Sequence, residues 1–186
     1  MRVLFSFAPL ILFPFVAGFY SVEAGLWVAT AAAILAVVGD RLLYRHTVKI
    51  LDAGQLLLFG ILALGAIVLR HLPDISWIRL IINAGLLAIV LVSIAAAAPF
   101  SLQYAREQTP QSLWNSQHFI ATNFRISWGW AAAFAVSTAA DLARLFVPAI
   151  PHIAESGAGI AALVLAGAFT GWYPKYVRAA ASTRTQ

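Results

Sequence analysis

The sequence predicts an all-α, polytopic transmembrane helical bundle of about six spans, the first of them kinked by proline. Hydrophobic residues make up 62% of the 186 residues, and charged residues only 10%. A soluble domain carries about 25% charged residues, so the polar side chains here are too few to cover a water-facing surface. The apolar residues also fall into separate runs close to the length of about 20 residues that crosses a bilayer as a helix.

The first apolar run, Val3–Tyr20, is barely long enough to cross a membrane. Pro9 and Pro14 lie inside it, and each removes a backbone donor, which predicts a bent or broken helix. A second interpretation stays open, because Met1-Arg2, the apolar run and Val22-Glu23-Ala24 resemble a signal peptide that is cleaved after Ala24.

Five further apolar runs follow along the chain. They are Gly25–Tyr44, Ile50–Arg70, Trp77–Phe100, Asn123–Val147 and Ala154–Tyr173. We expect the last run to end before Pro174. Gly167 and Gly171 form a GxxxG motif, for which we expect packing within the bundle rather than dimerisation. Residues 1–186 are therefore predicted to form a single integral membrane domain.

Lys and Arg residues orient the six predicted spans, because they gather in cytoplasmic loops. With the N-terminus inside, the inner side collects Arg2, Arg41, Arg45, Lys49, Arg106, Arg125, Lys175, Arg178 and Arg184. The outer side collects Arg70, Arg79 and Arg144. This bias predicts that both termini are cytoplasmic, in a cell inner (plasma) membrane.

The only long polar interval is residues 99–125, which we expect to form a cytoplasmic interfacial loop. Thr109-Pro110 is typical of an N-cap followed by proline at the first helical position, and Ser116 is a second candidate cap. Its stretch Tyr104–Phe124 contains no glycine, which favours short helical pieces on the membrane face over a flexible tether. Its candidate binding residues are Gln103, Arg106, Glu107, Trp114, His118, Asn123 and Arg125. A plain connector is the alternative to a binding site.

Three polar residues fall within the predicted spans, where ionisable groups are costly and often functional. Asp141 and Arg144 are three residues apart and so share a helix face. Asn83 lies in the first half of the fourth run. The alternative is a structural ion pair in which Arg144 extends toward the interface.

No catalytic residues, cofactor or metal are predicted. The sequence has no GxSxG, HExxH or phosphate-binding loop, and no cysteine. Its four histidines fall near the predicted span ends. The expected partners are membrane lipids and other envelope or division proteins, without nucleic acid, and oligomerisation stays open.

Several apolar motifs resemble the bacterial intracellular septation protein A family, in order along the chain. They are Phe7–Phe13 (FAPLILF), Val28–Ile34 (VATAAAI), Phe59–Leu62, Trp77 with Arg79 and Ile82, and Trp130 with Phe134. Ser127 stands where the family has an Asn, and the loop around Gln103–Phe119 is longer. The family is described with five spans rather than six. The resemblance implies an inner-membrane protein linked to septum formation and envelope integrity.

Three functions therefore stay open at the level of sequence. The first is a non-enzymatic membrane protein that supports septation or envelope integrity through its polar loop. The second is a small transporter or channel lined by Asn83, Asp141 and Arg144. The third is a lipid-modifying membrane enzyme that uses the inner-face loop.

Overall fold

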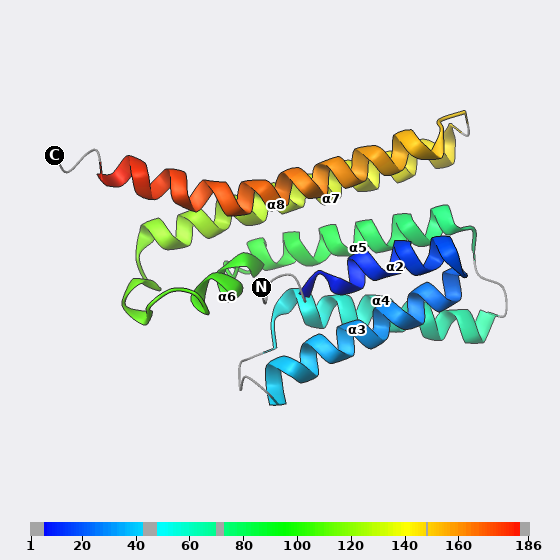
Figure 1. Ribbon diagram of the computed structural model, residues 1–186, viewed down its shortest axis with the longest axis horizontal. Coiled ribbons are helices and arrows are strands. Elements are labelled where there is room, and N and C mark those ends of the chain that lie inside the picture. Colours follow the sequence, from blue (N-terminus) through cyan, green and yellow to red (C-terminus); the bar gives the residue numbers. More distant parts are fainter. Residues whose placement is uncertain (1–5, 43–47, 70–72, 148, 183–186) are drawn as a thin grey trace. The chain divides into compact units, whose positions relative to one another are not determined.

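The computed structural model describes residues 6–42, 48–69, 73–147 and 149–182, and its regular structure there is helical (Figure 1). The α-helices of this described part are α2 (Ala8–Phe19), α3 (Val22–Leu42), α4 (Ile50–Leu69), α5 (Ile75–Ala95), α6 (Phe100–Arg106), α7 (Gln117–Phe146) and α8 (His152–Ser182), with a 3-10 helix, η1 (Gln111–Leu113), between α6 and α7. The predicted all-α class is confirmed. Some residues used in the predictions lie outside the described part, namely Met1, Arg2, Val3, Tyr44, Arg45, Arg70, Pro148 and Arg184.

Four helical segments in the described residues are long and apolar enough to cross a membrane: α3, α4, α5 and Ile153–Val177 of α8. The chain is therefore a multi-pass membrane protein by helix length and hydropathy. The other two predicted spans correspond to α2 and α7, which are not among these four. With 12 residues, α2 is about 18 Å long, whereas the hydrocarbon core is about 30 Å thick. Pro14 lies within α2, and Pro9 lies at its beginning.

The helices form two compact units, which meet in sequence between Ile89 and Val90 of α5. Unit 1 contains α2, α3, α4 and the first part of α5. Unit 2 contains the end of α5, together with α6, η1, α7 and α8. Each unit is described by itself below.

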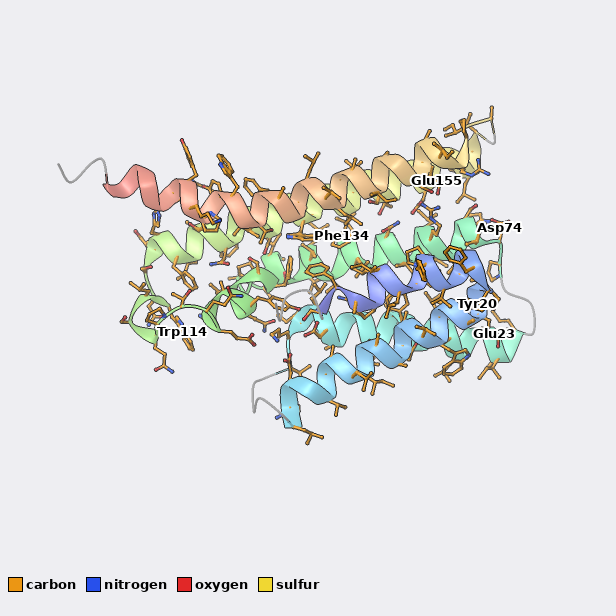
Figure 2. All side chains as sticks on the ribbon, in the orientation of Figure 1. Tyr20, Glu23, Asp74, Trp114, Phe134 and Glu155 are labelled. Carbon is orange, nitrogen blue, oxygen red and sulfur yellow. The ribbon has the colours of Figure 1, made fainter. Side chains whose placement is uncertain are left out.

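In unit 1, α2 and α3 form a tight antiparallel hairpin, with Tyr20 and Glu23 at its turn (Figures 1 and 2). The Ser21 hydroxyl accepts a hydrogen bond from the Ala24 backbone N–H at 3.1 Å and so caps the start of α3. Gly25 allows the two backbones to approach, since a Cβ there would lie 2.9 Å from the Phe13 carbonyl oxygen.

Aromatic and small residues join α2 and α5 to α4. Phe13 of α2 packs on the fully buried Phe59 of α4, with ring centroids 5.9 Å apart. Leu58 of α4 packs over Gly85 of α5, where an added Cβ would lie 2.8 Å from its Cδ1. These contacts place the core of unit 1 around the middle of α4.

In unit 2, α7 and α8 run antiparallel side by side (Figure 1). A Cβ at Gly129 would lie 3.1 Å from the Phe169 ring, so the helices pack closely there. Within the described residues, no atom outside the local helix backbone lies within 4 Å of a Cβ at Gly167 or Gly171. The described part of unit 2 therefore has no close helix contact at this GxxxG motif, for which we expected packing within the bundle.

The C-terminal helix also corrects a predicted boundary. We expected the last apolar helix to end before Pro174, but α8 continues through Pro174 to Ser182. A proline removes only one backbone donor, and membrane helices tolerate this when nearby groups satisfy the freed carbonyl.

The close approach of α2 to α3 at Gly25 leads to a testable prediction. Gly25→Ala should destabilise the α2–α3 hairpin by about 1–3 kcal/mol, because the atoms that its Cβ meets belong mostly to the backbone and cannot rotate away. The matched control is Gly39→Ala, also in α3, where nothing in the described residues lies within 4 Å of the new Cβ. It should stabilise the helix by up to about 1 kcal/mol. Denaturant unfolding of the full chain in detergent measures both, and equal effects would contradict the close approach.

Candidate functional site

The polar interval begins with a sharp chain reversal after α5. Ala97 adopts a left-handed conformation, with φ of 54°, and the Ala98 N–H bonds to the Ser93 carbonyl at 3.0 Å. This geometry ends a helix and normally favours glycine, because a Cβ is strained there. Pro99 follows as the N-cap of α6, and the Phe100 N–H donates to the Ser93 hydroxyl at 3.2 Å.

A buried group of polar side chains then fixes α6 against α7. The Ser101 hydroxyl donates to the Asn123 carbonyl at 2.8 Å, and it accepts from the Ser127 hydroxyl at 3.0 Å. The Asn123 amide nitrogen donates to the Phe119 carbonyl at 2.8 Å. Ser101, Asn123 and Ser127 are all buried. A hydrogen bond between buried partners contributes about 1 kcal/mol, and breaking one leaves a costly unpaired group.

Aromatic rings pack beside this hydrogen-bonded group. Phe100 makes edge contacts with Tyr104, at 6.2 Å between centroids, and with Trp130 of α7, at 6.5 Å. Trp130 also packs on the fully buried Phe134 at 5.9 Å. The short helix α6 is therefore held by polar and apolar contacts together, although its 7 residues are too few to be stable alone.

The stretch between α6 and α7 is folded around Trp114 (Figure 2). Its indole N–H donates to the Thr109 carbonyl at 2.9 Å, and the Arg106 guanidinium lies 5.4 Å from the centroid of its ring. A cation–π contact of this kind contributes about 0.5–1 kcal/mol at an exposed site. Two of the predicted binding residues, Arg106 and Trp114, therefore lie in contact.

The predicted caps of this stretch have different outcomes. Ser116 is confirmed as the N-cap of α7, since its hydroxyl accepts from the Phe119 N–H at 3.2 Å. The prediction for Thr109-Pro110 is wrong by one position. Pro110 is itself the N-cap, with an extended ψ of 142°, and η1 begins at Gln111. Thr109 does not cap the helix, and its carbonyl accepts a hydrogen bond from the Trp114 indole N–H.

The other predicted binding residues are dispersed along the interval. Gln103 and Glu107 are half-buried on α6 and directly after it, and His118 is exposed in the first turn of α7. Arg125 is exposed and donates to the Tyr173 hydroxyl on α8. Nearby, the Trp130 indole donates to the Thr170 hydroxyl at 2.9 Å. We call residues 99–125 the polar platform.

A second polar group lies at the opposite end of the α7–α8 hairpin, near Glu155 (Figure 2). The Arg144 Nε lies 3.2 Å from a carboxylate oxygen of Glu155, and its Nη1 donates to the Ile150 carbonyl. Asp141 is buried one turn before Arg144. Sequence reasoning selected Asp141 and Arg144 but missed Glu155, whose only signal was its place in the first turn of an apolar helix. Asn83 is half-buried on α5, in unit 1.

The buried Ser101 and its partner Ser127 were also missed, because serine is common in helices and the partners of Ser101 lie 22 and 26 residues away. Comparisons with protein-family models, curated proteins and solved structures found no match to this chain. The resemblance to the septation protein family therefore stays a hypothesis, and the function has to be inferred from the platform itself.

Proposed function

We propose that this chain is a non-enzymatic membrane protein that supports septation or cell-envelope integrity in bacteria, and that the polar platform is its docking surface for another envelope or division protein. The observation that carries the proposal is the fixed fold of the platform. Near its beginning, Ser101 is hydrogen-bonded to Asn123, near its end, and to Ser127, just after it. In its middle, the Trp114 indole is hydrogen-bonded to the Thr109 carbonyl. A plain connector would not need these contacts.

The exposed side of the platform favours a protein partner. Its exposed polar residues are mostly neutral and able to form hydrogen bonds: Gln108, Gln111, Ser112, Asn115, Gln117 and His118. Such residues suit a wet protein interface, in which about one hydrogen bond forms per 100–200 Å². Arg106, which packs on Trp114, and the exposed Arg125 are its cations, and each would add about 1 kcal/mol of attraction to an anionic leaflet. Lipid contact and protein docking are therefore compatible.

We further propose six spans, with both termini and the platform in the cytoplasm of a bacterial inner membrane. The four long apolar helices would be completed by α2, bent at Pro14, and by α7. With 30 residues, α7 is about 45 Å long and packs along α8, which itself contains a candidate span. The uneven distribution of Lys and Arg supports this orientation.

Single cysteines test the topology, because the natural sequence has none. Ser112→Cys in η1 and Ala149→Cys between α7 and α8 are both at exposed positions. If α7 crosses the membrane, a membrane-impermeant maleimide added to intact cells should label Ala149→Cys at once, and Ser112→Cys only after permeabilisation. Labelling of both positions from the same side would contradict the six-span proposal.

A pair of surface substitutions tests the function. Gln111→Arg with Asn115→Arg places two cations on the exposed platform without changing a contact described above. We expect this variant to reach the membrane at wild-type amounts but to leave cells long, with fewer septa, in a host that lacks its own copy. Cell length and septum spacing under the microscope provide the measurement.

The matched control for this experiment is Tyr20→Arg, at an 82% exposed position in the turn of unit 1. It should restore normal division. The proposal is contradicted if the double variant restores division as well as the wild type, or if cells that lack the protein divide normally.

A further inference from the structure

Four aromatic rings lie together near the end of α8, where that helix runs beside the beginning of α7 (Figure 1). Phe169 stacks on Tyr173 with ring centroids 4.8 Å apart, and Trp172 stacks on Tyr176 at 5.0 Å. The two stacks also meet, since the rings of Trp172 and Tyr173 lie 6.3 Å apart. Trp172 is 56% exposed and Tyr176 is 55% exposed, so their stack is open to the surroundings of the helix.

The other stack is fixed against α7. The Phe169 ring packs over Gly129, where an added Cβ would lie 3.1 Å from its Cδ1. The hydroxyl of Tyr173, which stacks on Phe169, accepts a hydrogen bond from the Arg125 guanidinium of α7. Arg125 is therefore held at a defined place beside the aromatic rings, although its side chain is exposed.

The charges around Arg125 favour an anionic ligand. A guanidinium has several N–H donors, and Tyr173 accepts only one of those of Arg125. In the described part of the chain, no carboxylate forms an ion pair with Arg125. Moreover, α7 has no Asp or Glu from Gln117 to Ala140 and α8 has none from Ser156 to Ser182, whereas the exposed Lys175 adds a second cation. A ligand that is rich in acceptor oxygens therefore suits this place.

The position of the rings along α8 indicates the class of anion. Trp172 and Tyr176 belong to the last turns of the candidate span Ile153–Val177, and Trp and Tyr at the ends of spans lie at the level of the lipid headgroups. Ala168 and Leu165 are exposed about one and two turns earlier, on the same helix face as Trp172. This face fits an acyl chain that runs along α8 from a phosphate at the headgroup level.

We propose that Arg125, Tyr173, Trp172 and Tyr176 form a binding site for a phospholipid with an anionic headgroup. The Arg125 guanidinium binds the phosphate through charge-assisted hydrogen bonds, and the Tyr173 hydroxyl positions it. The stack of Trp172 on Tyr176 contacts the glycerol and the upper part of an acyl chain. A lipid in this place joins the end of α8 to α7, so its binding stabilises unit 2. The site needs no protein partner at the exposed platform residues, so either proposal can fail without the other.

Thermal unfolding of the purified full chain in detergent tests the site, with added lipids that share their acyl chains and differ in headgroup. Phosphatidylglycerol should raise Tm and then reach a plateau. Phosphatidylcholine should raise it less, because its headgroup has no net charge and its ammonium finds no carboxylate on these two helices. Inorganic phosphate at the same concentration should leave Tm unchanged, since it has no acyl chain. Native mass spectrometry should detect bound phosphatidylglycerol directly.

Substitutions with matched controls assign the effect to these residues. Arg125→Gln should raise the Kd for phosphatidylglycerol roughly tenfold, because it removes charge-assisted hydrogen bonds. Its control is Arg41→Gln, at an exposed position at the end of α3 in unit 1, which should leave the Kd unchanged. Tyr173→Phe removes only the hydroxyl that positions Arg125, so it should weaken binding by a smaller factor. Trp172→Leu should also weaken binding, whereas Trp77→Leu, at a 50% exposed position in α5, should not.

Three results would overturn the proposal. Equal rises of Tm with phosphatidylglycerol and phosphatidylcholine would show that the rings only anchor α8 in the interface. A rise with inorganic phosphate alone would show a site for a free anion. Arg125→Gln that binds phosphatidylglycerol as tightly as Arg41→Gln would place the lipid elsewhere. If Arg125→Gln does not fold, Tyr173→Phe decides the question, because wild-type affinity in that variant contradicts the proposed position of the phosphate.

Discussion

The hydroxyl of Ser101 is the contact on which the polar platform depends. It donates to the Asn123 carbonyl and accepts from the Ser127 hydroxyl, and the Ser101 N–H also points to Ser127 Oγ at 3.4 Å. One small side chain therefore joins the start of α6 to two successive turns of α7. Because α6 is short and follows a strained residue, Ala97, little else in its own sequence would keep it helical.

The same constraint explains where the other polar side chains of the protein lie. Water does not reach the interior of an apolar helical bundle, so it cannot form hydrogen bonds with the donors and acceptors there. Each buried polar group therefore needs a hydrogen-bond partner within the protein. Thr30, Ser137 and Thr138 bond to carbonyls one turn earlier in their own helices. The Trp130 indole N–H on α7 donates a hydrogen bond to the Thr170 hydroxyl on α8. Against this pattern, the buried Oε1 of Gln55 is an exception, since it has no hydrogen-bond partner among the described residues.

Much of the helical arrangement follows from the sequence, because long apolar runs have few ways to satisfy their backbones in lipid. The run predicted for Ile50–Arg70 corresponds to α4, Ile50–Leu69. The run predicted for Gly25–Tyr44 begins earlier, at Val22, because Ser21 caps that helix. Short helical pieces were predicted for Tyr104–Phe124, which contains η1 and the start of α7. The start of α6 at Phe100 was not predicted, because that residue was placed at the end of an apolar run. The number of spans could not be settled in this way, since α2 is short and α7 carries charged and hydroxyl side chains among its apolar residues.

The partners within each site were far less predictable. Ser101 and Ser127 are 26 residues apart, and neither has a feature in the sequence that marks it as buried. The ion pair between Arg144 and Glu155 requires α8 to fold back along α7, so the sequence alone did not indicate it. Pairings of this kind depend on tertiary packing, which hydrophobic periodicity does not encode.

Pulsed electron paramagnetic resonance tests the fixed fold of the platform most directly. The chain has no cysteine, so spin labels at Ser112→Cys in η1 and Ala132→Cys on the exposed face of α7 are the only two present. In the full chain in lipid nanodiscs, we expect one narrow distance distribution, which broadens when Ser101→Ala is added. A broad distribution without Ser101→Ala would show that residues 99–125 are a mobile connector, and it would contradict the docking platform.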